Sequence, residues 1–162
     1  MRASKELLPA SHYDDPVEKT GSIRSKNRPR VLLVENNEAF IELIVSVLPD
    51  DFDLVGVCRN GAEAIQSCLD LIPDLLLSDI VLPVMDGIQV TRELRHLSKQ
   101  TKIIMITGIE DPQFVSAALA AGAKGYVFKR KIASDLHRAI NAVLDGGSFV
   151  SPSRPVRPGP GR

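Results

Sequence analysis

The chain has few of the features that mark an extracellular, membrane-bound or disulfide-stabilised protein. Its 162 residues include two cysteines, Cys58 and Cys68, whose spacing fits neither a zinc site nor a redox motif, so we expect reduced thiols in packing roles. No apolar run approaches the length of a membrane-spanning helix, and the first residues lack the apolar segment of a signal peptide. These absences predict a cytoplasmic protein without a membrane partner.

Charge of one sign is not in excess either. Lys plus Arg and Asp plus Glu number 20 each, so the whole chain offers no electrostatic reason to favour nucleic acid as a partner. The run Lys129-Arg130-Lys131 is short, and we interpret it as a solvated loop rather than a nucleic-acid site.

Motifs typical of enzymes that act on small molecules are missing as well. The sequence has no glycine-rich phosphate loop, no nucleophile elbow and no cluster of His and Cys at metal-ligand spacing. The three histidines, His12, His96 and His137, are scattered and are expected at the surface. We therefore do not expect an enzyme.

What the chain does contain is a regular alternation of short aliphatic runs and helix-length segments. The runs are apolar on both faces, as strands of a parallel sheet covered on both sides must be. The pattern predicts an α/β fold of the doubly wound (βα)₅ type, with a five-stranded parallel sheet. The expected strands are residues 30–35, 53–58, 74–79, 102–107 and 125–128.

The segments between the runs carry helix signals. Proline marks the exits of the first two helices, and Asp111-Pro112 is a helix start in which the aspartate caps and the proline loses no useful donor. Asp86-Gly87 is expected to serve the turn before the third helix rather than a site. The spacing of apolar residues predicts the buried faces of two helices: Ala62, Ile65, Leu69 and Ile72 in the second, and Ile88, Leu94 and Leu97 in the third. The last helix is expected to begin at about Ser134.

The ends of the chain differ from its middle. Residues 1–28 have no sustained apolar period, and residues 152–162 alternate proline with arginine and glycine. Neither stretch can bury enough apolar surface to offset the entropy lost on ordering, so both are predicted to be disordered tails around a domain at residues 29–151.

Polar residues gather where the expected strands end. In an open parallel sheet, ligands bind at the carboxyl ends of the strands, and here these ends carry Glu35, Asn36, Asp79, Thr107 and Lys129. Neighbouring carboxylates repel unless a cation joins them, and oxygen ligands suit Mg²⁺. A hydroxyl and an ammonium beside them suit the oxygens of a phosphoryl group.

Three segments, PDLLLSDIVLPVMDG, IIMITG and AGAKGYVFK, occur in this order and at these strand ends. With them the chain resembles a receiver domain of bacterial two-component response regulators, the CheY-like fold, over about residues 29–151. The resemblance implies that Asp79 accepts a phosphoryl group from a sensor histidine kinase or a phosphotransferase, with Mg²⁺ bound beside it.

The resemblance also implies roles for four other residues. Thr107 is the switch hydroxyl that follows the phosphoryl group, and Lys129 pairs with the phosphoryl oxygens. Tyr126 is the aromatic residue that changes rotamer, and the backbone carbonyl of Val81 is a further metal ligand. The signal would leave through the face formed by the fourth helix, the fifth strand and the fifth helix.

Two departures from the family pattern modify these expectations. Typical receivers end the first strand with two acids, whereas this chain has Glu35 followed by Asn36, which carries no charge. Two carboxylates instead of three predict weak Mg²⁺ binding. Val81 and Ile109 stand where relatives often place polar groups that influence the hydrolytic water, so we expect a long-lived phosphoryl group.

Three interpretations of the function stay open at this point. The leading one is a stand-alone phosphoacceptor receiver that signals through contact with an unknown output protein. The second is a phosphorylation-independent binding module for a kinase, a phosphotransferase or a second copy in a homodimer. The third follows from resemblance to receivers that usually carry a C-terminal helix-turn-helix domain: the chain would be the regulatory part of a transcription factor continuing beyond Arg162. No recognition helix fits in the residues present, so no nucleic-acid binding is expected of this chain.

Overall fold

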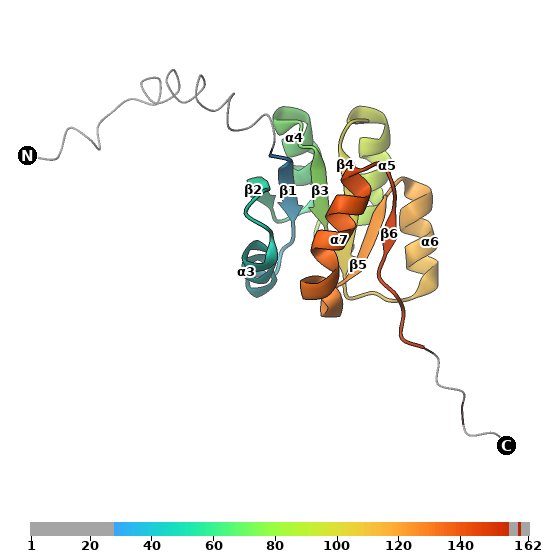
Figure 1. Cartoon of the computed structure of the whole chain (residues 1–162). Helices are drawn as coiled ribbons and strands as arrows, with labels where there is room; N and C mark the ends of the chain where they lie inside the picture. The colour runs from blue at the N-terminus through green and yellow to red at the C-terminus, as the bar shows by residue number, and fades with distance from the viewer. Residues whose placement is uncertain (1–27, 156–158, 160–162) are drawn as a thin grey trace, which may run out of the picture.

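The computed structural model describes residues 28–155 and residue 159 (Figure 1). The predictions of disorder for residues 1–28 and 152–162 therefore fall largely outside the described residues. The strands are β1 (Arg30–Val34), β2 (Asp53–Cys58), β3 (Leu75–Ser78), β4 (Lys102–Thr107), β5 (Gly125–Phe128) and β6 (Phe149–Val150). The helices are α3 (Glu38–Val47), α4 (Gly61–Leu71), α5 (Gly87–Leu97), α6 (Pro112–Ala121) and α7 (Ile132–Leu144), with a 3₁₀ helix η1 (Lys129–Lys131).

The strands form one parallel sheet in the order β2-β1-β3-β4-β5-β6. This confirms the doubly wound α/β fold. The chain leaves β1 on one side for β2 and returns on the other side for β3, so the strand order reverses at β1. The polar residues at the carboxyl ends of β1 and β3 lie at this reversal, where ligands bind in sheets of this kind.

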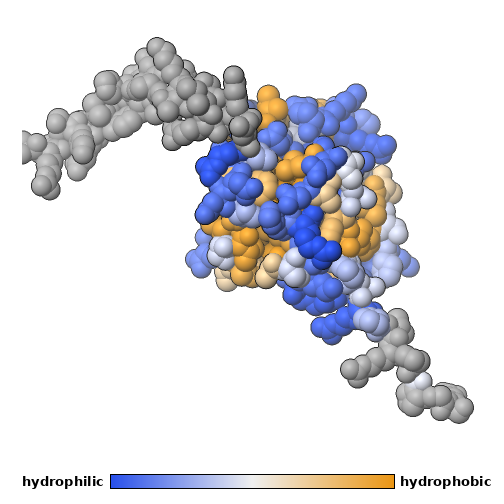
Figure 2. All heavy atoms as spheres, in the orientation of Figure 1, coloured by the Kyte–Doolittle hydropathy of each residue, from blue (hydrophilic) through white to orange (hydrophobic). Residues whose placement is uncertain are grey.

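Helices cover both faces of the sheet (Figure 1). One apolar core lies between the sheet and α4, α5 and α6, and a second lies between the sheet and α3 and α7. Strands β3 and β5 are buried along their whole length, which explains why their sequences do not alternate. Figure 2 shows hydrophilic residues interspersed with smaller apolar areas over the viewed face.

The sixth strand was not predicted. β6 extends the sheet beside β5, where the Phe149 amide donates to the Lys124 carbonyl at 3.0 Å and the Ser151 amide donates to the Tyr126 carbonyl at 2.8 Å. Two strand residues after a pair of glycines are too few to show a period in the sequence.

Four helices begin at a side chain that caps the first turn, which fixes each helix close to the end of the preceding strand. Each capping oxygen accepts a hydrogen bond from a backbone amide of the first turn; the caps are Asn37, Asn60, Asp86 and Asp111. The expected start of the last helix was late, because α7 begins at Ile132 directly after η1.

The buried face of α4 differs from the face that the spacing predicted. Its buried residues are Gly61, Ala64 and Cys68, whereas Ile72 is 53% exposed. In α5, Leu97 is likewise 52% exposed, and the small polar Thr91 is buried in the packing with α6. The fully buried positions of α4 are therefore held by small residues, while the predicted Ile65 packs against the core half-buried.

Both cysteines are free and buried, as expected. Burial raises the pKa of the Cys68 thiol to about 12, and the nearby Cys58 adds to the effect. A thiol that keeps its proton is a poor nucleophile, which agrees with a packing role.

Within the part of the chain that the structure describes, no helix has both the length and the apolar character needed to cross a membrane.

Candidate functional site

Three of the predicted site residues meet at the carboxyl edge of the sheet. Glu35 follows β1, Asp79 follows β3, and Lys129 follows β5 as the first residue of η1. The Lys129 Nζ atom lies 2.8 Å from Glu35 Oε2 and 2.8 Å from Asp79 Oδ2. The ammonium group therefore bridges two carboxylates that would otherwise repel each other.

Lys129 keeps its proton in this position. Burial lowers the pKa of its ammonium group, but the contacts with Asp79 and Glu35 together outweigh burial, so the pKa is raised above the ordinary lysine value. Two carboxylates and one ammonium leave a formal charge of about −1, which suits a cation.

Asp79 is held in one orientation by the backbone. Its Oδ1 atom accepts from the Ile80 amide at 2.6 Å and from the Val81 amide at 3.3 Å, while Oδ2 faces Lys129. The Asp79 amide donates to the Val34 carbonyl at 3.0 Å, so the β1–β3 pairing continues up to the site. The carboxylate is thus fixed by sheet geometry.

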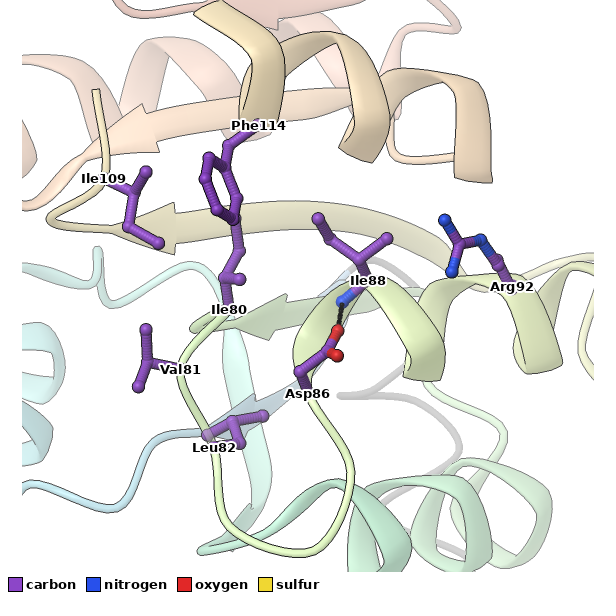
Figure 3. A pocket seen from close by; sticks show the side chains of 8 residues that line it. All are labelled: Ile80, Val81, Leu82, Asp86, Ile88, Arg92, Ile109 and Phe114. Atoms are coloured by element: carbon purple, nitrogen blue, oxygen red, sulfur yellow. Dashed lines mark hydrogen bonds between the residues drawn. The ribbon is translucent and has the colours of Figure 1, made fainter. Parts of the chain in front are cut away.

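Gly87 supports this arrangement, and sequence reasoning missed that role. A Cβ atom built on Gly87 would lie 2.1 Å from the Asp79 carbonyl oxygen, so any side chain there would push the backbone of Asp79 away. The preceding Asp86 caps α5 through a capping box with Gln89. Its Oδ1 atom accepts from the Ile88 amide at 2.8 Å (Figure 3), as expected for a residue that starts the helix.

Glu35 is almost fully buried, with 1% of its side chain exposed. Its Oε1 atom accepts from the Asn36 amide at 3.0 Å and from the Asn37 amide at 2.9 Å. Its Oε2 atom accepts no aligned hydrogen bond from any described residue, and Lys129 is its charged neighbour. A buried carboxylate oxygen with spare acceptor capacity fits a metal ligand.

The residues present fit a magnesium site with a small charge. Among the residues that the structure describes, no group of three or more His, Cys, Asp or Glu side chains could hold a metal. Asn36 directly follows Glu35 and is exposed, and a role for its side-chain amide as a further ligand stays a prediction. Weak binding of Mg²⁺ stays a prediction that this donor set supports.

Thr107, at the end of β4, and Tyr126, in β5, share one neighbour. Both are buried, and both contact the backbone of Ile109: the Ile109 amide donates to Thr107 Oγ1 at 3.3 Å, and the Tyr126 hydroxyl donates to the Ile109 carbonyl at 2.7 Å. Burial raises the pKa of Tyr126 to about 12, and Asp79 and Asp111 add to this. The aromatic side chain is therefore inside the fold and protonated.

A groove of about 460 Å³ opens at Ile80 and Val81, the two residues that follow Asp79 (Figure 3). Its walls come from the β3–α5 loop, α5, the β4–α6 loop and α6, and side chains from these segments point into it in the figure. Val81, which is 64% exposed, and Ile109 both lie in its lining, so neither offers a polar group to a water molecule. The full lining is Ile80, Val81, Leu82, Asp86, Ile88, Arg92, Ile109 and Phe114.

The run Lys129-Arg130-Lys131 forms the 3₁₀ helix η1 rather than an irregular loop, with Arg130 exposed. Lys129 lies between Glu35 and Asp79, and Arg130 pairs with Glu110. Glu110 is 20 positions away in the sequence, so the local pattern gave no sign of the second pair.

A comparison with known protein families assigns this chain to one of them. The model of the response regulator receiver domain matches residues 31–141, which is more than half of the chain. The chain belongs to this family. Receiver domains are signalling proteins that interact with histidine kinases and phosphotransferases and typically bind Mg²⁺ at their acidic pocket, and some of them dimerise.

Curated relatives fall into two size classes. A Pseudomonas aeruginosa protein described as a transcriptional regulator is 41% identical over 119 residues, which are 72% of this chain and 57% of that protein. The chemotaxis protein CheY of Halobacterium salinarum is 35% identical over 115 residues, 71% of this chain and 96% of CheY. The chain thus spans little more than half of some relatives and nearly all of others.

Solved structures agree with the fold. A two-component response regulator of the LuxR family from Aurantimonas sp. SI85-9A1 is similar with a TM-score of 0.72 and 29% identity, covering 77% of this chain and 91% of that one. The signal receiver domain of NarL from Mycobacterium tuberculosis gives a TM-score of 0.71 and 28% identity, with 74% and 98% covered.

Proposed function

We propose that this receiver is a phosphoacceptor: Asp79 takes a phosphoryl group from a sensor histidine kinase or a phosphotransferase, and the modified domain signals by contact with another protein. The observation that carries the proposal is the bridge of Lys129 between Asp79 and Glu35 at the carboxyl edge of the sheet. A receiver domain that only bound a partner would not need two buried carboxylates, Asp79 and Glu35, bridged by the ammonium group of Lys129 at this edge.

The transfer is a displacement at phosphorus. One carboxylate oxygen of Asp79 attacks the phosphorus of a phosphohistidine, the P–N bond breaks, and the imidazole nitrogen that leaves takes a proton from solvent. The Ile80 and Val81 amides hold the carboxylate in place for this attack. Lys129 is within reach of both acids and would place its charge on the phosphoryl oxygens.

Glu35 and Asp79, with the amide of Asn36 and the backbone carbonyl of Val81, are the groups that would hold Mg²⁺. When bound, the ion neutralises charge on the phosphoryl oxygens during transfer. Val81 and Ile109 line the groove beside the acceptor without offering a polar group to water. The acyl phosphate is therefore expected to persist.

Phosphorylation adds about −1.5 to −2 charge units at Asp79. Thr107 is the hydroxyl placed to respond, and its neighbour Tyr126 connects it to the face of α6, β5 and α7. We propose this face as the output surface, with an output protein or a second copy of the chain as the partner.

A second candidate function has its own support. Asn36 stands where typical receivers carry a second acid, which removes one charge from the pocket. The weaker metal site that follows favours a module that binds its partner whether or not Asp79 is modified.

Intact-mass spectrometry after incubation with acetyl phosphate and Mg²⁺ separates the two. A phosphoryl adduct is expected on the parent chain and on Asp86→Asn, because asparagine preserves the helix cap, but not on Asp79→Asn. No adduct over a wide Mg²⁺ range, repeated with a phosphorylated histidine phosphotransferase as donor, would favour the phosphorylation-independent module.

A further inference from the structure

An ion pair joins the β4–α6 loop, which carries Glu110, to the 3₁₀ helix η1, which carries Arg130. Arg130 Nε donates to Glu110 Oε2 at 2.7 Å, and a second guanidinium nitrogen donates to Glu110 Oε1 at 2.8 Å. Both side chains are partly covered, with 27% of Arg130 and 36% of Glu110 exposed. The two parallel hydrogen bonds fix the guanidinium and carboxylate planes relative to each other.

The position of the pair links it to Tyr126. Glu110 directly follows Ile109, whose carbonyl accepts the Tyr126 hydroxyl and whose amide donates to Thr107. Arg130 directly follows Lys129 and lies over the Phe128 ring, with its guanidinium carbon 5.5 Å from the ring centroid. The Phe128 ring packs edge-on against Tyr126 at a centroid distance of 5.9 Å.

Glu110 is charged under ordinary conditions. The hydrogen bond from Arg130 lowers the pKa of its carboxyl group, and the positive charges of Arg130, Arg154 and Lys131 act in the same direction. A reversed pair would place a base at position 110 among these positive charges, so charge reversal is a poor test of the contact.

We infer that Glu110 and Arg130 form a clamp that holds the β4–α6 loop in the arrangement with Tyr126 buried, and with it the form of the α6–β5–α7 face. The biological meaning of the clamp rests on the proposed function. The clamp itself can be tested without phosphorylation. Loss of either partner frees the Ile109 carbonyl to move and lets Tyr126 swing outward.

The test uses Tyr126 as its own reporter. The chain has two tyrosines, so incorporation of 3-fluorotyrosine into a Tyr13→Phe background gives one ¹⁹F signal, from Tyr126. A soluble paramagnetic compound broadens this signal in proportion to the time the ring spends exposed. The variants are Glu110→Ala, Arg130→Met, which keeps the stem over Phe128, and the double variant.

Arg59→Met is the matched control. Arg59 pairs with Glu38 at 2.8 Å at the same edge of the sheet, but this pair does not touch the β4–α6 loop or η1. Each clamp variant is expected to increase the paramagnetic broadening about two- to fivefold, the range typical of a single ion pair near the surface, and the control to leave it unchanged. Because the partners act as one unit, the double variant should match the single variants.

Three results would overturn the inference. The clamp variants could broaden no more than Arg59→Met, the double variant could show the product of the single effects, or the signal of the parent chain could be broadened as much as that of the variants. Intact masses of the same samples after acetyl phosphate treatment keep it separate from the proposed function. Absence of the adduct with acetyl phosphate, and again with a phosphorylated histidine phosphotransferase as donor, counts against phosphoacceptor function and leaves the broadening result standing. An adduct with unchanged broadening refutes the clamp alone.

Discussion

Asp79 and Asp135 are both buried carboxylates, with 6% and 3% of their surface exposed, but their surroundings differ in kind. Asp79 faces the ammonium of Lys129 and lies beside an open groove. Asp135 accepts from the hydroxyls of Ser134 at 2.9 Å and Ser151 at 2.7 Å, and its cationic neighbour Arg138, at 3.9 Å, lies mostly in solvent.

The difference shows what each carboxylate can do. A lysine side chain can turn toward new oxygens without breaking the backbone structure, so the contacts of Asp79 can be exchanged during a reaction. Ser151 also accepts from the Phe128 amide at 3.1 Å, so the contacts of Asp135 tie α7, β5 and β6 together. Exchange there would release β6. Burial alone therefore does not mark a functional acid; its partners do.

The largest effect that would test this comparison is expected from Lys129→Met. Loss of the ammonium removes a preorganised donor to the phosphoryl oxygens, so the initial rate of adduct formation with acetyl phosphate should fall about 100-fold. Intact-mass time courses measure this rate. Lys131→Met, in the same 3₁₀ helix, is the control and should label like the parent; equal loss in both variants would contradict a specific role of Lys129.

Ser151→Ala tests the other half of the comparison. The change leaves Asp135 Oδ2 and the Phe128 amide without their buried partner, which should lower the free energy of unfolding by about 1–3 kcal/mol. Urea denaturation measures the loss, with the exposed Ser153→Ala as the control. Acetyl phosphate labelling should stay within about twofold of the parent, because a structural network does not touch the reacting atoms. A large labelling defect would show that the two regions are coupled.

Asn36→Asp should increase the difference between the surroundings of Asp79 and Asp135, because it adds a third acid near Asp79 and none near Asp135. Unit charges about 4 Å apart interact by about 1–4 kcal/mol, so the affinity for Mg²⁺ should rise about tenfold or more. Calorimetric titration measures the affinity. Asn37→Asp is the control, since an aspartate there can still cap α3 through the Phe40 amide, and it should change affinity less.

The smallest expected effect is a dependence of the free energy of unfolding on pH that arises from Tyr126. Its pKa is raised to about 12 in the fold, above the ordinary value of about 10, chiefly by burial. The unfolded chain therefore releases the proton first. The stabilisation is complete below pH of about 10 and is lost as pH rises toward 12.

Between pH values of about 10 and 12, the free energy of unfolding of Tyr126→Phe should consequently fall less steeply with pH than that of the parent chain. The two slopes should differ by less than about 1.4 kcal/mol per pH unit. Denaturation series at pH values near 10 and 11 measure the slope. Equal slopes would mean that the phenol titrates as it does in the unfolded chain.

Local patterns predicted much of the fold. Five strands, the helix between each pair, and the cap at Asp111 were all read from runs and spacing that span a few residues. The pattern failed where the decisive contact was distant. The fully buried residues of α4 are small, Ala64 and Cys68 among them, and Ile65 and Leu71 pack beside them half-buried, whereas Ile72 lies outward.

The site divides in the same way. Asp79, Glu35 and Lys129 could be proposed from the sequence because each stands at the end of a strand, and parallel strands bring their carboxyl ends to one edge. The steric need for Gly87 beneath Asp79 and the pairing of Arg130 with Glu110 could not, since each depends on atoms from another segment.

The sequence by itself determined the alternation of strands and helices and which residue types stand at the strand ends, because these follow from short-range periodicity and turn chemistry. Only the tertiary structure decided that one ammonium bridges two carboxylates, that Tyr126 is inside, and that a short sixth strand closes the edge beside β5. These features arise from contacts between residues 16 to 94 positions apart, where the direction and distance of each side chain depend on the packing of the whole sheet.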